Sequence, residues 1–156
     1  MDKEAVFNAL NRIMELELAG AAHHTHYALM VHSFHRLPIV AWLKQQAEVR
    51  RVHTRQADEP VTWLGGHPSL SIDPLIESVK HDIGDILLEP RDGELEALNA
   101  YYDLFDLSKD KNARLEEYAR DMIAKKLMRR DEGDKMSVKL SYHVRGIPRA
   151  RLELCR

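Results

Sequence analysis

Apolar side chains recur at alternating steps of three and four residues along two stretches of the chain, each about 30 residues long. This spacing places them on one face of an α-helix. The first stretch runs without proline from about Lys3 to His35. The second follows Pro38 and ends at Gly65 and Gly66, residues that favour a helix C-terminus. Two helices of this length predict a helical bundle.

Two further helices are expected in the second half of the chain. Asp73 and Pro74 have the character of an N-cap and a first-turn proline, which predicts a third helix from this point. That helix is expected to kink or turn at residues 90–93 and to end at about Leu107. After a short polar segment, the apolar pattern predicts a fourth helix over residues 115–136.

The predicted fold class is all-α, an antiparallel four-helix bundle. A long connection at residues 65–73 is expected to cross the length of the bundle between the second and third helices. The bundle is assigned to residues 1–137. Residues 138–156 lose the helical pattern and carry five basic residues against one acid, which predicts a loose basic C-terminal tail.

The composition fits one globular domain and excludes several classes of protein. A chain of 156 residues with 44% hydrophobic side chains can bury its own core. The net charge of -2 gives no overall basic field, so neither a nucleic-acid nor a membrane partner is expected. The acidic, amphipathic N-terminus lacks the pattern of a secretory signal, which predicts a cytoplasmic protein. The single cysteine, Cys155, excludes a disulfide framework.

Polar residues interrupt the apolar faces at specific positions. Glu17 lies in the middle of the first stripe, and Arg50 and His53 lie three residues apart in the middle of the second. Lys126 and Arg129 repeat this spacing on the fourth helix. Because a buried charge is costly unless it is paired or bound to a metal, these residues predict a functional or ion-paired layer inside the bundle.

A metal centre is one interpretation of this layer. A bundle whose helices each supply an acid or a Glu-x-x-His pair at one level can hold two iron or manganese ions. Glu17, His53 and Asp92, the acid nearest the core edge of the third helix, provide about half of such a set. The alternative is that Glu17 forms a salt bridge and His53 is a structural histidine.

Histidine is enriched near the end of the first predicted helix. A surface metal patch is one interpretation of this cluster, but its members fall on several helix faces, which favours solvated side chains. The cluster consists of His23, His24, His26, His32 and His35.

Over roughly residues 5–137 the chain resembles the ferritin-like superfamily, and bacterioferritin subunits in particular. The resemblance is carried by residues 10–20, 53–68 and 115–126, together with the chain length and helix order. It implies homo-oligomeric subunits that form a hollow cage. Such subunits oxidise Fe(II) with oxygen or peroxide at an intrasubunit di-iron centre and store ferric mineral.

The resemblance also assigns ligand positions. Glu17 corresponds to the first-helix ligand, His53 to the imidazole ligand of the second helix, and Asp92 to the glutamate of the third. Glu48 is a further candidate ligand. The haem-binding members of the family use a methionine of the second helix, and this position is Arg51 here, so no haem ligand is expected.

Three ligand positions depart from the family pattern. The bridging glutamate of the second helix falls on Arg50, and the Glu-x-x-His pair of the fourth helix falls on Lys126 and Arg129. One explanation is that these cations pair with Glu17, Asp92 and Glu48. The subunit would then still assemble, with weak or absent ferroxidase activity.

A shift of reading frame is the other explanation. The segment from Ala124 to Arg129 can be encoded GCG AAG AAG CTC ATG CGG, and reading one base earlier yields Glu-Glu-Ala-His-Ala, a Glu-x-x-His motif. Sequencing the gene across codons 45–55 and 124–138 distinguishes the two explanations.

Two other functions remain open. A DNA-protecting mini-ferritin is suggested by the spacing of Glu59 from Leu64, the glycine pair and Pro68, although Arg55 stands where that family needs an acid. The other is a non-catalytic helical scaffold. Assembly is expected for a ferritin-like subunit, with apolar residues on its outer faces. The candidates are Trp42, Trp63, Phe34 and Tyr102.

Overall fold

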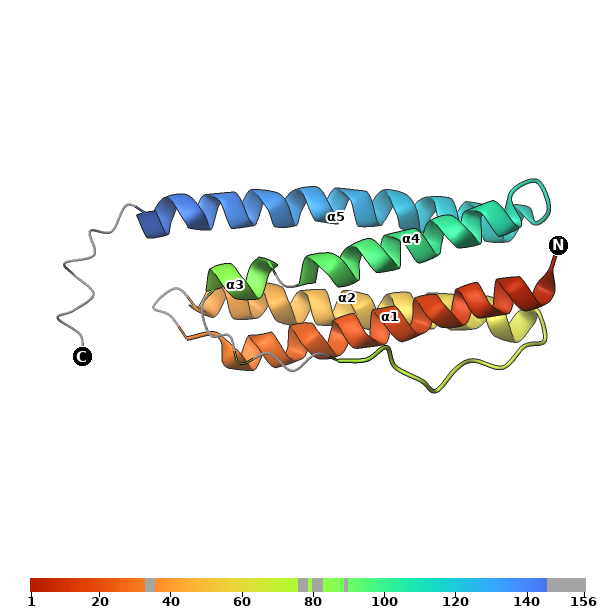
Figure 1. Cartoon of the computed structure of the whole chain (residues 1–156), viewed down its shortest axis with the longest axis horizontal. Coiled ribbons are helices and arrows are strands. Elements are labelled where there is room, and N and C mark those ends of the chain that lie inside the picture. The colour runs from red at the N-terminus through yellow and green to blue at the C-terminus, as the bar shows by residue number, and fades with distance from the viewer. Residues whose placement is uncertain (33–35, 76–78, 80–82, 89, 146–156) are drawn as a thin grey trace.

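The computed structural model describes residues 1–32, 36–75, 79, 83–88 and 90–145. In this part of the chain every regular element is an α-helix, and the four long helices confirm the predicted all-α bundle (Figure 1). The elements are α1 (Lys3–Met30), α2 (Arg36–Trp63), α3 (Ile83–Leu88), α4 (Pro90–Ser108) and α5 (Ala113–Arg145).

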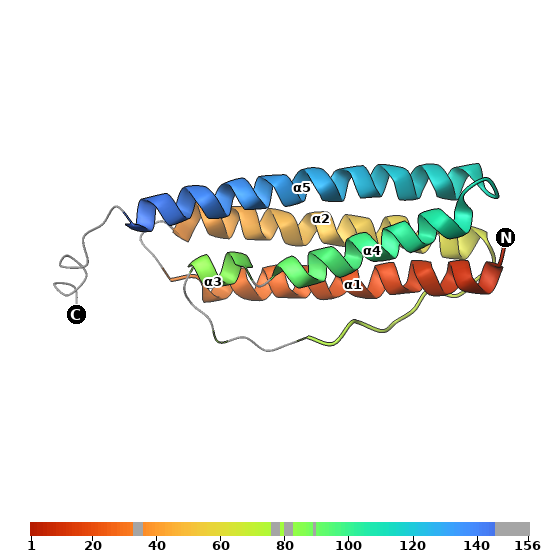
Figure 2. The same ribbon diagram turned by 45° about the horizontal axis from the view of Figure 1, so that its top comes forward.

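The connection after α2 determines the topology of the bundle. Helices α1 and α2 run in opposite directions, and the chain after α2 then returns along the outside of α1 to the other end (Figures 1 and 2). The short helix α3 lies at the end of the bundle where α2 starts, α4 begins nearer the middle, and a tight turn leads from α4 into the antiparallel α5. A connection between the second and third long helices was predicted to cross the bundle within residues 65–73, but Asp73 reaches only the middle of α1, where its N–H donates to Glu15, and the non-helical chain continues beyond it.

Local capping explains where the helices begin and end. The side chain of Asp2 accepts hydrogen bonds from the backbone N–H groups of Glu4 and Ala5, at 3.0 and 3.2 Å. At the end of α2, Gly65 adopts a φ of 85°, and the N–H of Gly66 donates to the carbonyl of Val61 at 2.8 Å. This left-handed conformation favours glycine, so the predicted helix end is confirmed.

The hydrophobic core consists of two clusters, one toward each end of α1. The first contains Leu10 and Ile13 of α1 together with Leu104 of α4, and the second contains Tyr27 of α1 and Leu43 of α2. Along α1, the buried Glu17 and His24 lie between the two clusters. A polar layer therefore separates two apolar regions of one bundle.

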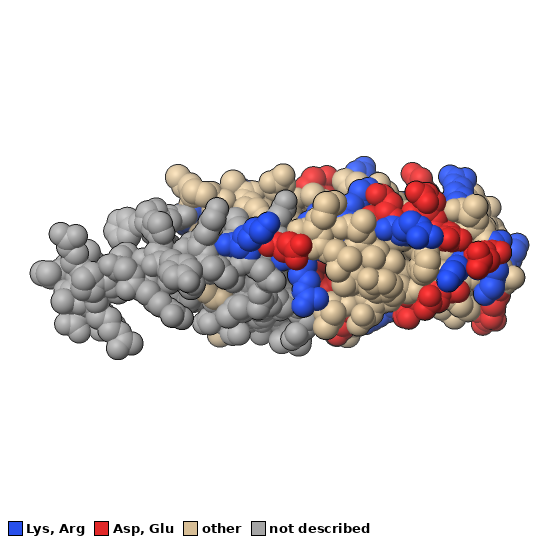
Figure 3. Space-filling view, turned by 90° about the horizontal axis from the view of Figure 1, so that it is seen from above, with Lys and Arg blue, Asp and Glu red and all other residues tan. Residues whose placement is uncertain are grey.

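The surface carries some of the apolar residues expected there. Trp63 and Tyr102 are exposed, whereas Trp42 packs against the second core cluster and Phe34 lies outside the described residues. Seen from above, charged side chains gather toward the end where α4 leads into α5, and uncharged residues cover the middle of this face (Figure 3). Within the described residues, no helix has the length and apolarity needed to cross a membrane.

The first helix ends earlier, and the second begins earlier, than predicted. Helix α1 stops at Met30, whereas the apolar pattern predicted helix as far as His35, which lies outside the described residues. Helix α2 starts at Arg36 and contains Pro38 in its first turn. A first-turn proline is compatible with a helix because the N–H groups there have no intrahelical partner. Pro38 therefore does not mark the break between the helices.

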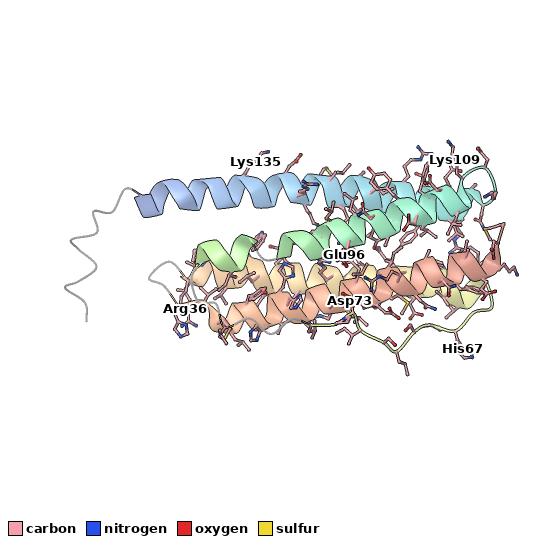
Figure 4. The ribbon with its side chains drawn as sticks, in the orientation of Figure 1. Arg36, His67, Asp73, Glu96, Lys109 and Lys135 are labelled. Atoms are coloured by element: carbon pink, nitrogen blue, oxygen red, sulfur yellow. The ribbon has the colours of Figure 1, made fainter. Side chains whose placement is uncertain are left out.

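The predicted start of the third helix at Asp73 is wrong. Residues 71–75 are not helical, and the backbone N–H of Asp73 donates to the carbonyl of Glu15 at 3.3 Å. The side chain of Arg12, on α1, pairs with Asp73 and with Glu96 of α4. These two acids lie near each other (Figure 4). These contacts hold the segment against α1 in an extended conformation. Pro90, expected in a turn, instead opens α4.

Helix α5 extends beyond the predicted boundary of the bundle. Its backbone stays helical through residues 138–145, which were predicted to belong to a loose tail. The apolar stripe is lost in this segment, which reduces its packing against the bundle. The backbone can nevertheless stay helical, because neither glycine nor proline occurs between Gly133 and Gly146 to break the helix. The rest of the predicted tail, residues 146–156, lies outside the described residues.

Candidate metal centre

Glu17 lies at the centre of the polar layer and is completely buried. Its Oε1 atom lies 2.8 Å from the Lys126 ammonium, 3.2 Å from the Tyr101 hydroxyl and 3.3 Å from Nδ1 of His53. Its Oε2 atom accepts a hydrogen bond from the Arg50 guanidinium at 3.1 Å. A carboxylate offers about four lone-pair sites. The protein itself therefore places four donors on this carboxylate, three at Oε1 and one at Oε2.

Glu94 completes a closed arrangement of charges. One of its carboxylate oxygens pairs with Arg50, and the other lies 3.3 Å from the Lys126 ammonium. Arg50 and Lys126 thus each contact both Glu17 and Glu94. We call these four residues the ion-pair ring. Its two carboxylates and two cations balance in charge.

Gly20 provides the space for the Arg50 side chain. A Cβ atom at this position would lie 2.6 Å from both Cζ and an Nη atom of the guanidinium. Such a distance is shorter than any normal contact, and the guanidinium is held by two carboxylates on its other edges. The absence of a side chain on α1 at residue 20 therefore allows Arg50 to reach Glu17.

The neighbouring cations keep both carboxylates ionised. Burial alone would raise the pKa of Glu17, but Lys126 and Arg50 outweigh it and hold that pKa far below its ordinary value. Burial also opposes ionisation of Glu94, and Arg50 and Lys126 again lower its pKa. Burial opposes the charge of Arg50, yet the two carboxylates raise its pKa above the usual value. Glu17, Glu94 and Arg50 are therefore charged at neutral pH.

The other polar groups of the layer are neutral. Burial lowers the pKa of His53 despite the opposing effect of Glu17, so the ring nitrogen Nδ1 carries a proton toward Glu17 while the imidazole stays uncharged. Burial and Glu17 raise the pKa of Tyr101, whose hydroxyl donates to Glu17. Burial and the charge of Arg50 lower the pKa of His24 to about 4. Its Nδ1 lies 2.7 Å from the Gly20 carbonyl.

These residues do not fit a pair of metal ions. Both oxygens of Glu17 already interact with donors of the protein, and Arg50 and Lys126 each contact the two carboxylates that a bridging metal would bind. Among the side chains that the structure describes, no group of three or more acids, histidines or cysteines is arranged to hold a metal. This holds equally for the described part of the histidine cluster, His23, His24, His26 and His32.

The structure brings together most of the residues that the sequence singled out. Glu17, His53, Arg50 and Lys126 meet in the layer. Arg129 is close enough for its charge to help lower the pKa of His53. Of the pairings predicted for the cations, those of Arg50 and Lys126 with Glu17 therefore occur inside the bundle.

The carboxylate of the third long helix was missed. The side chain of Asp92 lies outside the described part of the structure, and Glu94 is the α4 acid that contacts Arg50 and Lys126. A signal was present, because Glu94, Ala97, Tyr101 and Leu104 follow one another at helical steps of three, four and three. The expected turn over residues 90–93 obscured this register.

Glu48 is not part of the layer. Its side chain is exposed and pairs with the exposed Arg51 at 2.7 Å, three residues along the same helix. Glu48 lies two residues before Arg50, which places it on a different face of α2. The structure therefore separates this predicted ligand from Glu17 and His53.

The crossing connection, four long helices and a carboxylate-containing layer at mid-length define a ferritin-like protein. The family model for the ferritin-like domain matches residues 7–140. This match extends over most of the chain. The chain therefore belongs to the ferritin-like domain family.

Two solved structures share this fold. A ferritin-like, diiron-carboxylate protein from Bacillus anthracis has a TM-score of 0.79 at 20% identity, covering 88% of this chain and 99% of that chain. The dodecameric thioferritin of Bacteroides fragilis, a bacterioferritin-related protein, has a TM-score of 0.83 at 15% identity, covering 94% of this chain and 92% of its own. No curated protein sequence matches the chain.

Proposed function

We propose that this chain is an iron-storage subunit of a homo-oligomeric, bacterioferritin-like assembly, and that it lacks a working ferroxidase centre. Iron is its cargo. Membership of the ferritin-like family supports the storage role. A similar fold in a protein described as a dodecamer supports the oligomer.

The observation that carries the proposal is that donors of the protein already engage both oxygens of Glu17. Oxidation of Fe(II) at a carboxylate centre requires oxygen or nitrogen atoms that are free to bind the metal. In this chain both oxygens of Glu17 are bonded to Arg50, Lys126, His53 and Tyr101. The bundle is therefore retained while the chemistry of its centre is replaced.

Exposed apolar residues on several elements support assembly. Large apolar side chains that are exposed in a single subunit commonly become buried between subunits. Leu29 of α1, Leu37 of α2 and Leu70 of the crossing connection are 73%, 75% and 102% exposed. Trp63 and Tyr102 add aromatic surface on α2 and α4.

Iron retention and oxidation can be measured on the same preparation. Light scattering gives the size of the assembly, absorbance gives the rate of Fe(II) oxidation in air, and gel filtration after peroxide-driven oxidation gives the iron that stays with the protein. We expect a multi-subunit assembly that retains iron but oxidises Fe(II) no faster than a protein-free sample. A monodisperse monomer, or an assembly that retains no iron, contradicts the storage role and favours a scaffold. Rapid oxidation that Glu17→Ala abolishes contradicts the loss of the ferroxidase centre.

Restoring the family's residues should restore oxidation. The triple variant Arg50→Glu, Lys126→Glu and Arg129→His replaces the three cations by the residue types that the family uses at these positions. We expect this variant to oxidise Fe(II) faster than the unmodified protein.

A matched control uses the adjacent positions. Arg51→Glu, Lys125→Glu and Arg130→His make the same changes of charge one residue away. Arg51 is exposed and Lys125 is partly exposed, and they pair with Glu48 and Asp121. This control should leave the oxidation rate unchanged, because it alters total charge but not the layer. Equal acceleration in both triple variants would show that general surface charge is responsible.

A further inference from the structure

The ion-pair ring connects all four long helices at one level. Glu17 comes from α1, Arg50 from α2, Glu94 from α4 and Lys126 from α5. The side chains of Arg50 and Lys126 are only 4% and 2% exposed. Each cation contacts carboxylates from two other helices. A bridging metal ion would make connections of the same kind between helices.

We propose that Arg50 and Lys126 are built-in counter-ions that replace metal at this centre, closing it to divalent cations and making the bundle independent of metal. Gly20 is part of this device as a positioning residue, because it provides the space for Arg50. The inference concerns the centre of the proposed storage subunit, but it does not depend on iron storage. It predicts the behaviour of any divalent cation in the absence of oxygen.

Charge balance explains why metal is excluded. The two carboxylates are already neutralised by two cations, so an entering dication would bring an uncompensated double charge into a buried site. To bind Glu17 it must first displace Lys126 or Arg50. Each displaced cation would lose both of its carboxylate partners while its side chain remains buried.

Steric fit explains how Arg50 reaches its place in the ring. One side of its guanidinium fills the space above Gly20. Its Nη atoms pair with the carboxylates of Glu17 and Glu94. Helix α1 therefore leaves room for the guanidinium at Gly20 and binds it through Glu17. A side chain at residue 20 would push the guanidinium out of the ring.

Cobalt and zinc test the proposal without iron chemistry. The unmodified protein is titrated anaerobically with Co(II) and with Zn(II), and the visible absorption of Co(II) and the thermal midpoint are recorded. Glu17→Gln is measured in parallel, so that signals common to both proteins are assigned to other sites, such as surface histidines. We expect no Co(II) absorption and no midpoint shift specific to the unmodified protein. Absorption or a shift that is lost in Glu17→Gln overturns the proposal.

Opening the ring should create a metal site. In Arg50→Glu with Lys126→Glu, we expect Co(II) absorption to appear and the midpoint to rise with metal concentration. Arg51→Glu with Lys125→Glu is the charge-matched control and should show neither change. If the ring variant folds and binds no more Co(II) than the control, the cations are not what excludes metal. If it does not fold, the titration of the unmodified protein still decides the question.

The role of Gly20 has its own matched control. Gly93 of α4 is also helical, and a Cβ added there would have no neighbour within 4 Å. We expect Gly20→Ala to lower the thermal midpoint and Gly93→Ala to leave it unchanged or raise it, because alanine favours a helix over glycine. Equal midpoints for the two variants would show that the space above Gly20 does not position Arg50.

Failure of this proposal and failure of the proposed function are distinguishable. Iron retention depends on the assembly and its cavity, whereas the cobalt titration reports only on groups that bind a dication. Cobalt binding at Glu17 would overturn the replacement of metal by cations and leave storage intact. Loss of iron retention would overturn storage and leave the ion-pair ring unaffected.

Discussion

The apolar end of the bundle and the ion-pair ring are both buried, but they are stabilised differently. Around Leu10 and Leu104 the packing is apolar and nondirectional, so each side chain contributes in proportion to the surface that it buries. In the ring, each charge is tolerated only because its partners are present. Truncating an apolar residue leaves a cavity, whereas removing one charge leaves others buried without compensation.

This difference between apolar packing and paired charges shows how the polar layer of a bundle can change its chemistry while the bundle keeps its fold. The apolar clusters hold the helices in place on both sides of the layer. Within that frame, two cations and two carboxylates satisfy one another. In the proposal above, cationic side chains take the place of metal ions in this layer while the apolar clusters hold the surrounding helices.

Neutralising Glu17 should have the largest effect on stability. Glu17→Gln keeps the shape of the side chain but leaves Arg50 and Lys126 with one carboxylate for two charges. Breaking a buried ion pair costs about 3–5 kcal/mol. Urea unfolding should show a loss of this size in the free energy of unfolding. Glu48→Gln, at an exposed position, is the control, and a comparable loss in both variants would contradict the distinction between the two sites.

Truncation at the apolar end should have a slightly smaller effect that depends on volume. Leu10 is fully buried, and Leu10→Ala should lower the free energy of unfolding by about 2–5 kcal/mol. Leu10→Met, which nearly conserves volume, should cost less than about 1.5 kcal/mol. The same urea experiment measures both. If Leu10→Met is as damaging as Leu10→Ala, then packing at this end is as specific as the contacts in the ring.

His24 should make stability depend on pH in the acidic range. Its pKa is about 4 in the folded protein, against an ordinary value of 6.5. As pH falls below 6.5, the unfolded chain takes up a proton that the folded protein does not bind until about pH 4. Stability present at neutral pH is therefore lost over this interval, by about 3 kcal/mol.

The variant His24→Gln isolates this effect. Between pH 7.5 and 4, the free energy of unfolding should fall less in His24→Gln than in the unmodified protein. Protonation of Glu17 and Glu94 on acidification also lowers the free energy of unfolding, because their pKa values are lowered in the folded state. The unmodified protein and His24→Gln share that loss. His67→Gln, in the exposed connection, is the control and should follow the unmodified protein. Identical pH profiles for all three would contradict the buried, neutral state of His24.

The exposed pair Glu48 and Arg51 should have the smallest effect. Its geometry resembles that of a pair in the ring, with an N–O distance of 2.7 Å, but both side chains are more than half exposed. Arg51→Ala should change the free energy of unfolding by less than about 1 kcal/mol, and high salt should remove the difference. If Arg51→Ala lowers the free energy of unfolding as much as Glu17→Gln does, burial is not what makes the ion pairs of the ring stronger than the exposed pair.

Much of the fold follows from local sequence patterns. Apolar periodicity identified the long helices, and Gly65 and Gly66 marked the end of α2. The same periodicity located Glu17 and Lys126 on the buried faces, because a charge at a core position stands out against its apolar neighbours. These features depend on residues close together in the chain, which is why the sequence alone could indicate them.

The rest depends on helix boundaries and contacts across the fold. Whether Asp92 or Glu94 faces the core changes with the start of α4, since each residue turns a helix by about 100°. The start of the third helix was misjudged because Arg12 and Glu15 hold Asp73 against α1, an interaction between distant residues. Likewise, the sequence showed cations in ligand positions, but only the folded chain shows which carboxylates they contact.

Iron-edge anomalous diffraction on crystals soaked anaerobically with Fe(II) tests the central claim most directly. We expect no anomalous peak between Glu17 and Glu94, with Arg50 and Lys126 still in contact with both carboxylates. Any peaks should lie at surface carboxylates or histidines. One or two strong peaks between Glu17, His53 and Glu94, with Arg50 and Lys126 turned away, would contradict the replacement of metal by the ion-pair ring.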